Sequence, residues 1–170
     1  MKQKQVFLMC GIPGSGKSTF IHGWRQLTDA VVSRDAVRFS IVSEDEEYFA
    51  KEDLVFKTFI NEINKALADE EKTERVFIDA THLAPKARAK VIRQLNKENI
   101  SELNAICFNV PIEVAIERNN QRSGRALVPE SAIRNMAKSY SLPTLNEGFT
   151  HIYEVNEKGE MTEHASIYLF

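Results

Sequence analysis

The chain has 170 residues, a formal net charge of −2 at pH 7 and 43% hydrophobic residues. This length suits one domain with its own core, and the charge gives no general attraction to nucleic acid or to anionic membranes. The apolar run Val6–Cys10 is too short for a signal peptide, and no run is long enough to cross a bilayer. We therefore expect a single domain over residues 1–170, cytoplasmic and without membrane contact.

Short apolar runs alternate along the chain with longer segments of helical periodicity. The runs predict strands covered on both faces, at 5–10, 30–33, 75–79, 104–110 and 151–155, the last a candidate edge strand. Helices are expected from the glycine loop to about Leu27, at about 48–69, at about 85–97, from Pro111 to Arg118 and from Pro129 onward. No structure is assigned to 157–170. The pattern predicts an α/β three-layer sandwich, with a five-stranded parallel sheet between helices.

Two further expectations concern burial. The helix at 48–69 should present Leu54, Ile60, Ile63 and Leu67 on one side. Cys10 and Cys107 lie within apolar runs and should be small core side chains.

The first strand leads into Gly11-Ile-Pro-Gly-Ser-Gly-Lys-Ser18, which matches the P-loop pattern G-x-x-x-x-G-K-[ST]. The glycines let backbone N–H groups turn toward phosphate oxygens, and the following helix adds its positive N-terminal dipole. Lys17 should reach the β and γ phosphates, and the Ser18 hydroxyl should hold Mg²⁺. The pattern predicts binding of ATP and Mg²⁺ in a P-loop NTPase or nucleotide-kinase-like fold. The expected ATP-binding residues here are Gly11, Pro13, Gly14, Ser15, Gly16, Lys17, Ser18 and Thr19.

Asp35 follows the second strand, which lies beside the P-loop strand in most folds of this kind. Its carboxylate could accept the proton of an attacking hydroxyl. Arg38 lies on the same helical face and could hold an acceptor phosphate. Alternatively, Asp35 caps a helix and pairs with Arg38 at the surface. Adenylate-kinase-like enzymes carry a similar Asp and Arg, and their acceptor needs no base.

The third strand ends in Asp79, a Walker-B-like position that should bind Mg²⁺ through water or orient Ser18. Thr81 and His82 extend toward the cleft and are candidate acceptor contacts. His82 could equally be a residue of a surface loop. The acidic stretch Ser43–Glu47 is assigned no chemistry.

Arg118, Arg122 and Arg125 cluster at a helix end and in the loop that follows. We expect a basic lid at about 118–128 that closes over ATP, with Arg122 stabilising charge on the leaving phosphate. The alternative is a solvated helix end whose arginines favour the dipole.

Taken together, these motifs resemble the 5′-kinase domain of phage-type and bacterial polynucleotide kinases. The similar pieces are Gly11–Thr19, Arg34-Asp35 with Arg38, Asp79 with Thr81, Phe108–Pro111, Arg118-Asn119 with Arg122, and Val128-Pro129. The resemblance implies ATP-dependent phosphorylation of a 5′-hydroxyl on DNA or RNA. It makes Asp35 the general base, Arg34 and Arg38 acceptor contacts, and Lys17 and Arg122 stabilisers of the transferred phosphate.

The chain departs from that family in four ways. His82 stands where the family tends to have Asn, and the lid is about one residue longer. No phosphatase or ligase module follows residue 170, and the acidic loop suits a long nucleic acid poorly. Two other hypotheses therefore stay open: a kinase for a metabolite, nucleoside or sugar nucleotide, as in zeta-toxin-like and gluconate-kinase-like relatives, and a nucleotide-gated binding module without an acceptor. The acceptor and the oligomeric state are not determined by the sequence.

Overall fold

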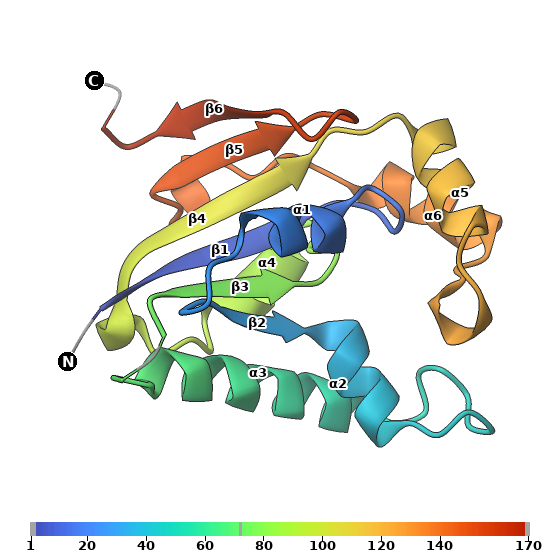
Figure 1. Ribbon diagram of the computed structural model, residues 1–170, viewed down its shortest axis with the longest axis horizontal. Helices are drawn as coiled ribbons and strands as arrows, with labels where there is room; N and C mark the ends of the chain where they lie inside the picture. The colour runs from blue at the N-terminus through green and yellow to red at the C-terminus, as the bar shows by residue number, and fades with distance from the viewer. Residues whose placement is uncertain (1–2, 72, 169–170) are drawn as a thin grey trace.

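The computed structural model describes residues 3–71 and 73–168. Within them, six strands form one mixed sheet in the order β2-β3-β1-β4-β5-β6, with β6 antiparallel to β5 and the other neighbours parallel (Figure 1). The strands are β1 (Lys4–Cys10), β2 (Ala30–Ser33), β3 (Arg75–Asp79), β4 (Ile100–Phe108), β5 (His151–Val155) and β6 (Met161–Ser166).

The α/β class is confirmed, whereas the five-stranded, fully parallel sheet is wrong. The tail that was left without structure supplies β6, and its last two residues lie outside the described ones. β6 pairs along the whole of β5, so β5 is an interior strand and not the edge. The short Asn156–Glu160 connection can only return the chain antiparallel, since a parallel return needs a crossover of a dozen or more residues.

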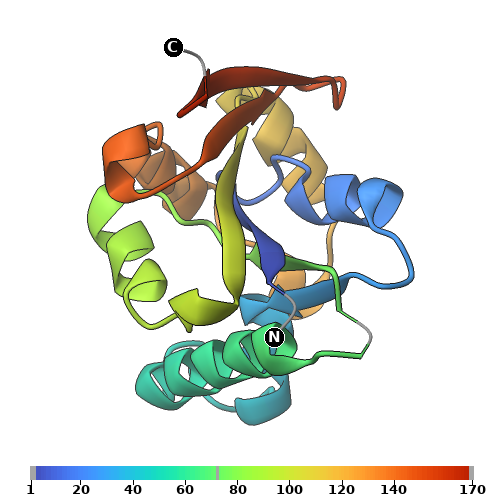
Figure 2. The same cartoon turned by 90° about the vertical axis from the view of Figure 1, so that its left-hand side faces the viewer.

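Helices cover both faces of the sheet, and Figure 2 shows α1 and α4 on opposite sides of it. The helices are α1 (Lys17–Trp24), α2 (Arg34–Ile41), α3 (Glu52–Ala68), α4 (Pro85–Ile92), α5 (Ile112–Asn120) and α6 (Glu130–Ser139), with 3₁₀ turns η1 (Lys97–Asn99), η2 (Gly124–Ala126) and η3 (Leu145–Glu147). α1 ends three residues earlier than expected because Arg25 adopts an extended backbone and a turn at Gln26–Asp29 leads into β2. α4 ends at Ile92 rather than at about Lys97.

The alternation of side chains along β1 explains the two layers of core. Val6, Leu8 and Cys10 contribute to the larger cluster, which includes Phe59 and Ile63 of α3. Phe7 and Met9 point to the opposite face, where they join the cluster that includes Ile21 of α1. Cys10 and Cys107 are both buried and free, as expected, and pair in register between β1 and β4.

One expected core residue is exposed. Ile60, Ile63 and Leu67 of α3 are buried as predicted, but the side chain of Leu54 is 51% exposed. Val55, Phe56 and Phe59 take the inward positions instead, so the buried stripe of α3 is rotated from the one that the periodicity suggested.

The strand order decides what surrounds the P-loop. β3 lies between β1 and β2, so the expectation that the second strand lies beside the P-loop strand is wrong. Leu8 pairs with Ile78, and Ser33 pairs with Asp79, which brings the carboxyl ends of all three strands to one edge of the sheet. Ligands of open α/β sheets bind at this edge. None of the helices in the described part of the chain is long and apolar enough to cross a membrane.

Candidate active site

The P-loop connects β1 to α1 at the carboxyl edge of the sheet. Gly14 and Gly16 have φ angles of 80° and 99°, which glycine adopts without the strain of a side chain. A Cβ on Gly14 would lie 2.1 Å from the carbonyl oxygen of Ala115, so this glycine also lets the loop pack against α5. In the described residues no side chain caps the N-terminus of α1, whose N–H groups therefore stay available to a phosphate.

Lys17 is folded back onto the loop that it follows. Its Nζ donates hydrogen bonds of 2.9 and 3.0 Å to the carbonyl oxygens of Gly11 and Ile12. Burial lowers the pKa of Lys17 to about 8; Asp79 and Asp35 oppose this shift, and Arg122 adds to it. Within the described residues the hydrogen bonds of this ammonium group go to neutral carbonyls, so it gains from an anion and fits a triphosphate ligand.

Ser18 and Asp79 meet beneath the P-loop. The hydroxyl of Ser18 donates a 2.8 Å hydrogen bond to Oδ2 of Asp79, the last residue of β3. Burial raises the pKa of Asp79, against the charge of Lys17 and the hydrogen bond from Ser18. A hydroxyl and a carboxylate are oxygen ligands of the kind that Mg²⁺ prefers when it keeps most of its waters and bridges phosphates. The donor set therefore fits Mg²⁺.

Asp35 lies in the first turn of α2 with an exposed side chain. Ser33 caps this helix by accepting a 3.3 Å hydrogen bond from the N–H of Ala36, so the alternative that Asp35 is the capping residue is wrong. The partner of Asp35 is Tyr48, whose hydroxyl donates to Oδ1 at 2.9 Å.

Arg34 and Arg38 both form salt bridges with Glu52, the first residue of α3. Arg38 is buried, and the suggestion that it pairs with Asp35 at the surface is wrong. The Nε atoms of both arginines are buried without a hydrogen-bond partner among the described residues. These two N–H groups are therefore unpaired donors that are shielded from solvent.

His82 is buried, which excludes a surface-loop residue. Its φ of +45° is unusual for a residue other than glycine, and its Nδ1 lies 2.6 Å from the carbonyl oxygen of Met9. Burial lowers the pKa of His82 to about 4, so the ring is neutral at pH 7 and Nδ1 carries the proton. Nε2 is then an acceptor with no partner in the described residues. Thr81 accepts a 2.9 Å backbone hydrogen bond from Gly11, which ties this loop to the P-loop.

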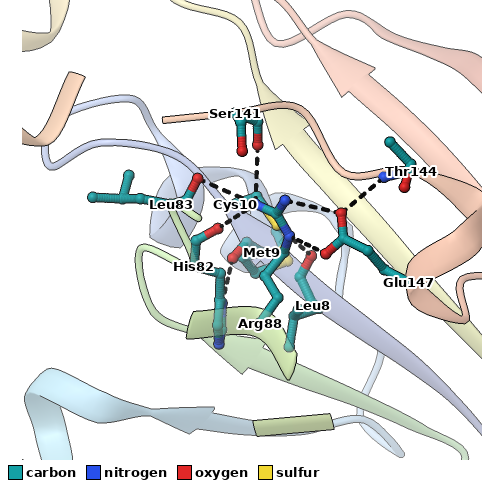
Figure 3. A network of polar contacts seen from close by, with 9 residues as sticks. All are labelled: Leu8, Met9, Cys10, His82, Leu83, Arg88, Ser141, Thr144 and Glu147. Atoms are coloured by element: carbon teal, nitrogen blue, oxygen red, sulfur yellow. Dashed lines mark hydrogen bonds and ion pairs between the residues drawn. The ribbon is translucent and has the colours of Figure 1, made fainter. Parts of the chain in front are cut away.

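Arg88 of α4 holds the loop that contains His82 by hydrogen bonds to its backbone (Figure 3). Its guanidinium, fully buried, donates to the carbonyl oxygens of His82, Leu83 and Ser141 and forms two hydrogen bonds with the carboxylate of Glu147. The His82 ring points away from this guanidinium. The network fixes the loop after β3 to the segment after α6 and thereby holds the unusual backbone of His82.

The lid segment, residues 118–128, places its three arginines differently. Arg118 donates to the carbonyl oxygens of Ser15 at 3.5 Å and Glu157 at 2.7 Å, so it touches the P-loop. Arg122 is exposed, and its charge acts on Lys17. Arg125 instead reaches the acceptor side, where it donates to the carbonyl oxygen of Val42 at 2.6 Å and lies 4.5 Å from the ring centre of Phe39. Its contact with ATP stays a prediction.

Three residues of the site were not predicted from the sequence: Tyr48, Glu52 and Arg88. Tyr48 contacts Asp35 across 13 positions, Glu52 contacts Arg34 across 18, and Arg88 contacts His82 across 6. No local pattern in the sequence marks such partners. Asn119 had a signal, because it belongs to the Arg118-Asn119 piece of the resemblance. Its amide donates to the carbonyl oxygen of Val128 and accepts from the N–H of the same residue, which closes the base of the lid segment.

The P-loop connects the central parallel strand β1 to α1, and its Ser18 donates a hydrogen bond to Asp79 of the neighbouring strand β3. These features define an α/β fold of the P-loop kinase-like class. Residues 6–143 match the family model described as an AAA domain (AAA_33), and the chain belongs to this family.

Two solved structures share the fold. A sugar kinase from Janibacter sp. is 16% identical, with a TM-score of 0.61 over 92% of this chain and 87% of that one. The Pnkp1/Rnl/Hen1 RNA repair complex contains a chain that is 20% identical, with a TM-score of 0.66 over 82% of this chain and 44% of that one. Among curated proteins, transcription factor bHLH140 of Arabidopsis thaliana is 29% identical over 160 residues. The match covers 89% of this chain but spans only 16% of the length of that relative.

Proposed function

We propose that this protein is an ATP-dependent kinase that transfers the γ-phosphate to the 5′-hydroxyl of a DNA or RNA end. The observation that supports the proposal is the position of Asp35. Its carboxylate is exposed at the edge of the sheet that carries Lys17 and Asp79, close enough for its charge to act on the pKa of both. An exposed base beside a phosphate loop suits the end of a chain that approaches from solvent.

In the proposed reaction, Asp35 accepts the proton of the acceptor hydroxyl as its oxygen forms a bond to the γ-phosphorus. The bond from that phosphorus to the β,γ-bridging oxygen breaks, and ADP leaves. Lys17, the N–H groups of the P-loop and Arg122 stabilise the charge that develops on the phosphates. Mg²⁺, held by Ser18 and Asp79, would neutralise the β and γ oxygens.

A kinase for a small metabolite is the second candidate, favoured by the shared fold with a sugar kinase. It needs an acceptor pocket that encloses a small molecule. The carboxylate of Glu52 already forms salt bridges with the guanidinium groups of Arg34 and Arg38, so an anionic metabolite would have to displace Glu52 to bind them.

The test is transfer from γ-labelled ATP with Mg²⁺ to a short 5′-hydroxyl oligonucleotide and, separately, to a set of nucleosides, sugars and sugar acids. We expect label on the oligonucleotide. Asp35→Asn should bind ATP normally and lose transfer by on the order of 10²-fold, the scale of a lost general base. Lys17→Ala should lose both ATP binding and transfer.

Glu70→Gln is the matched control, since it removes one exposed carboxylate just after the C-terminal end of α3 and away from the P-loop. Label confined to the small molecules would replace the proposal by the metabolite kinase. A normal rate for Asp35→Asn would contradict the assignment of the base, and tight ATP binding without any transfer would favour a nucleotide-gated binding module.

A further inference from the structure

The segment between α2 and α3 exposes two aromatic rings, although most large apolar side chains of the protein are buried. Phe49 is 67% exposed and Tyr48 37% exposed. Their ring centres lie 4.9 Å apart with an angle of 83° between the planes. In Figure 1 this segment projects from the body of the molecule at the end of α2. We refer to Tyr48 and Phe49 as the aromatic pair.

The guanidinium of Arg38 packs against both rings of the aromatic pair. The guanidinium of Arg38, itself buried, lies 4.4 Å from the ring centre of Tyr48 and 5.3 Å from that of Phe49. Glu52 fixes the same guanidinium by a salt bridge. Phe39 also approaches Tyr48, with 6.4 Å between ring centres, so Phe49 is the more exposed ring of the two. Phe49 is thus backed by a cation and by the edge-to-face contact with Tyr48, and it offers a preformed stacking surface.

The base of the proposed reaction lies directly beside this surface. The Tyr48 hydroxyl bonds to Asp35 at 2.9 Å, so a flat group stacked on the aromatic pair lies within about one nucleotide of the carboxylate. A hollow of about 390 Å³, lined by residues 49–54, adjoins Phe49. Both features allow a ring to approach from solvent.

The charges around the aromatic pair argue for recognition of a base rather than of a phosphate backbone. Glu44, Asp45 and Glu47 are exposed in the same segment, and they repel phosphates. Stacking is insensitive to this repulsion, and every nucleobase has a π-face that an aromatic side chain can contact. A single-stranded end offers such a face, whereas the stacked interior of a duplex does not.

We propose that the aromatic pair binds a nucleobase of the single-stranded 5′-hydroxyl end by stacking on Phe49, which Tyr48 supports edge to face, and so places its terminal hydroxyl at Asp35. This inference rests on the proposed function and names the acceptor more closely. It assigns discrimination to the presence of an unpaired base and gives the phosphates a minor part in affinity.

Binding and transfer are measured separately, so that failure of one proposal can be told from failure of the other. Binding is followed by fluorescence anisotropy of a 3′-labelled, 5′-hydroxyl hexanucleotide without ATP, and transfer by label from γ-labelled ATP. Each is repeated with a hexanucleotide whose two 5′-terminal sugars lack bases. The variants are Phe49→Ala, Phe49→Trp and the control Leu27→Ala, which removes a fully exposed apolar side chain far from Asp35, before β2.

Phe49→Ala should raise the Kd and the KM for the normal hexanucleotide about tenfold, the scale of one lost stacking contact, and leave the KM for ATP unchanged. The hexanucleotide that lacks two bases should bind weakly to the unchanged protein, and Phe49→Ala should not weaken its binding further. Phe49→Trp should restore affinity, and Leu27→Ala should behave as the unchanged protein. If the protein transfers phosphate to the hexanucleotide, but Phe49→Ala binds that hexanucleotide as tightly as the unchanged protein does, the stacking site alone is overturned. Binding that depends on Phe49 without transfer would overturn the kinase and retain the stacking site, and neither binding nor transfer would overturn both.

Discussion

The hydroxyl of Tyr48 donates a 2.9 Å hydrogen bond to Oδ1 of Asp35, across 13 positions of the sequence. Burial, followed by the charge of Asp35, raises the pKa of Tyr48 to about 12, so the hydroxyl remains a donor throughout the working range of pH. The bond orients an otherwise exposed carboxylate. It links the loop after α2 to the residue that we propose as the base.

Tyr48→Phe keeps the ring and removes the donor. We expect kcat for transfer to fall about fivefold, corresponding to about 1 kcal/mol for one hydrogen bond, while the KM for the oligonucleotide stays unchanged. Steady-state kinetics with γ-labelled ATP measure both constants. A raised KM with an unchanged kcat would mean that the hydroxyl of Tyr48, and not only its ring, contacts the acceptor and that it does not orient Asp35.

Lys17 predicts a pH dependence of ATP binding. Its pKa is lowered to about 8, so the free protein loses this charge as the pH rises through 8. A triphosphate favours the charged form and raises the pKa of Lys17, so binding at pH 8.5 should take up a proton and affinity should fall at higher pH. Calorimetric titration in buffers of different ionisation enthalpy measures the uptake. A proton count of zero in the unchanged protein would contradict the assignment.

Gly14 and Gly159 form a matched pair, since their φ angles are 80° and 81°. A Cβ on Gly14 would meet the Ala115 carbonyl at 2.1 Å, whereas nothing lies within 4 Å of one on Gly159. Gly159→Ala should cost about 1 kcal/mol of unfolding free energy from backbone strain, and Gly14→Ala clearly more. Urea unfolding compares the two variants. Equal losses would mean that the P-loop does not pack against α5 as described.

Arg88 and Glu147 test the support of the loop after β3. Arg88→Met leaves the Glu147 carboxylate without its ion-pair partner and the carbonyl oxygens of His82 and Ser141 without their donor, whereas Leu83 still accepts from the N–H of Ser141. We therefore expect a loss of about 3–5 kcal/mol in unfolding free energy. Arg134→Met, at an exposed arginine that pairs with Glu113 and Glu130, should change stability little.

The double variant Arg88→Met/Glu147→Leu should recover part of the loss, because it removes both charges. Chemical denaturation measures all three variants. If Arg88→Met were as stable as the unchanged protein, the network around Arg88 would not hold this loop.

The parts of the site that the sequence predicted are those built from neighbouring residues. The P-loop pattern located Lys17 and Ser18 between a strand and a helix, and Asp79 was placed at the end of a third strand, beside Ser18. The roles of these residues in ATP and Mg²⁺ binding stay predictions. The expected helices were placed to within a few residues, but α2 was not among them. Leu54 was assigned by periodicity to the buried side, which Val55 and Phe56 occupy instead.

By itself, then, the sequence determined the α/β class, the phosphate loop and the positions of β1 to β5 along the chain, since each depends on local periodicity or on a contiguous motif. It did not predict β6. The tertiary structure decided which strands are neighbours: β3 lies between β1 and β2, and β6 turns back on β5. It also decided that Arg38 pairs with Glu52 and not with Asp35, that Arg125 turns to the acceptor side and that Tyr48 reaches Asp35. Such partners are chosen by packing between segments distant in the chain, and no spacing of residues along a sequence encodes them.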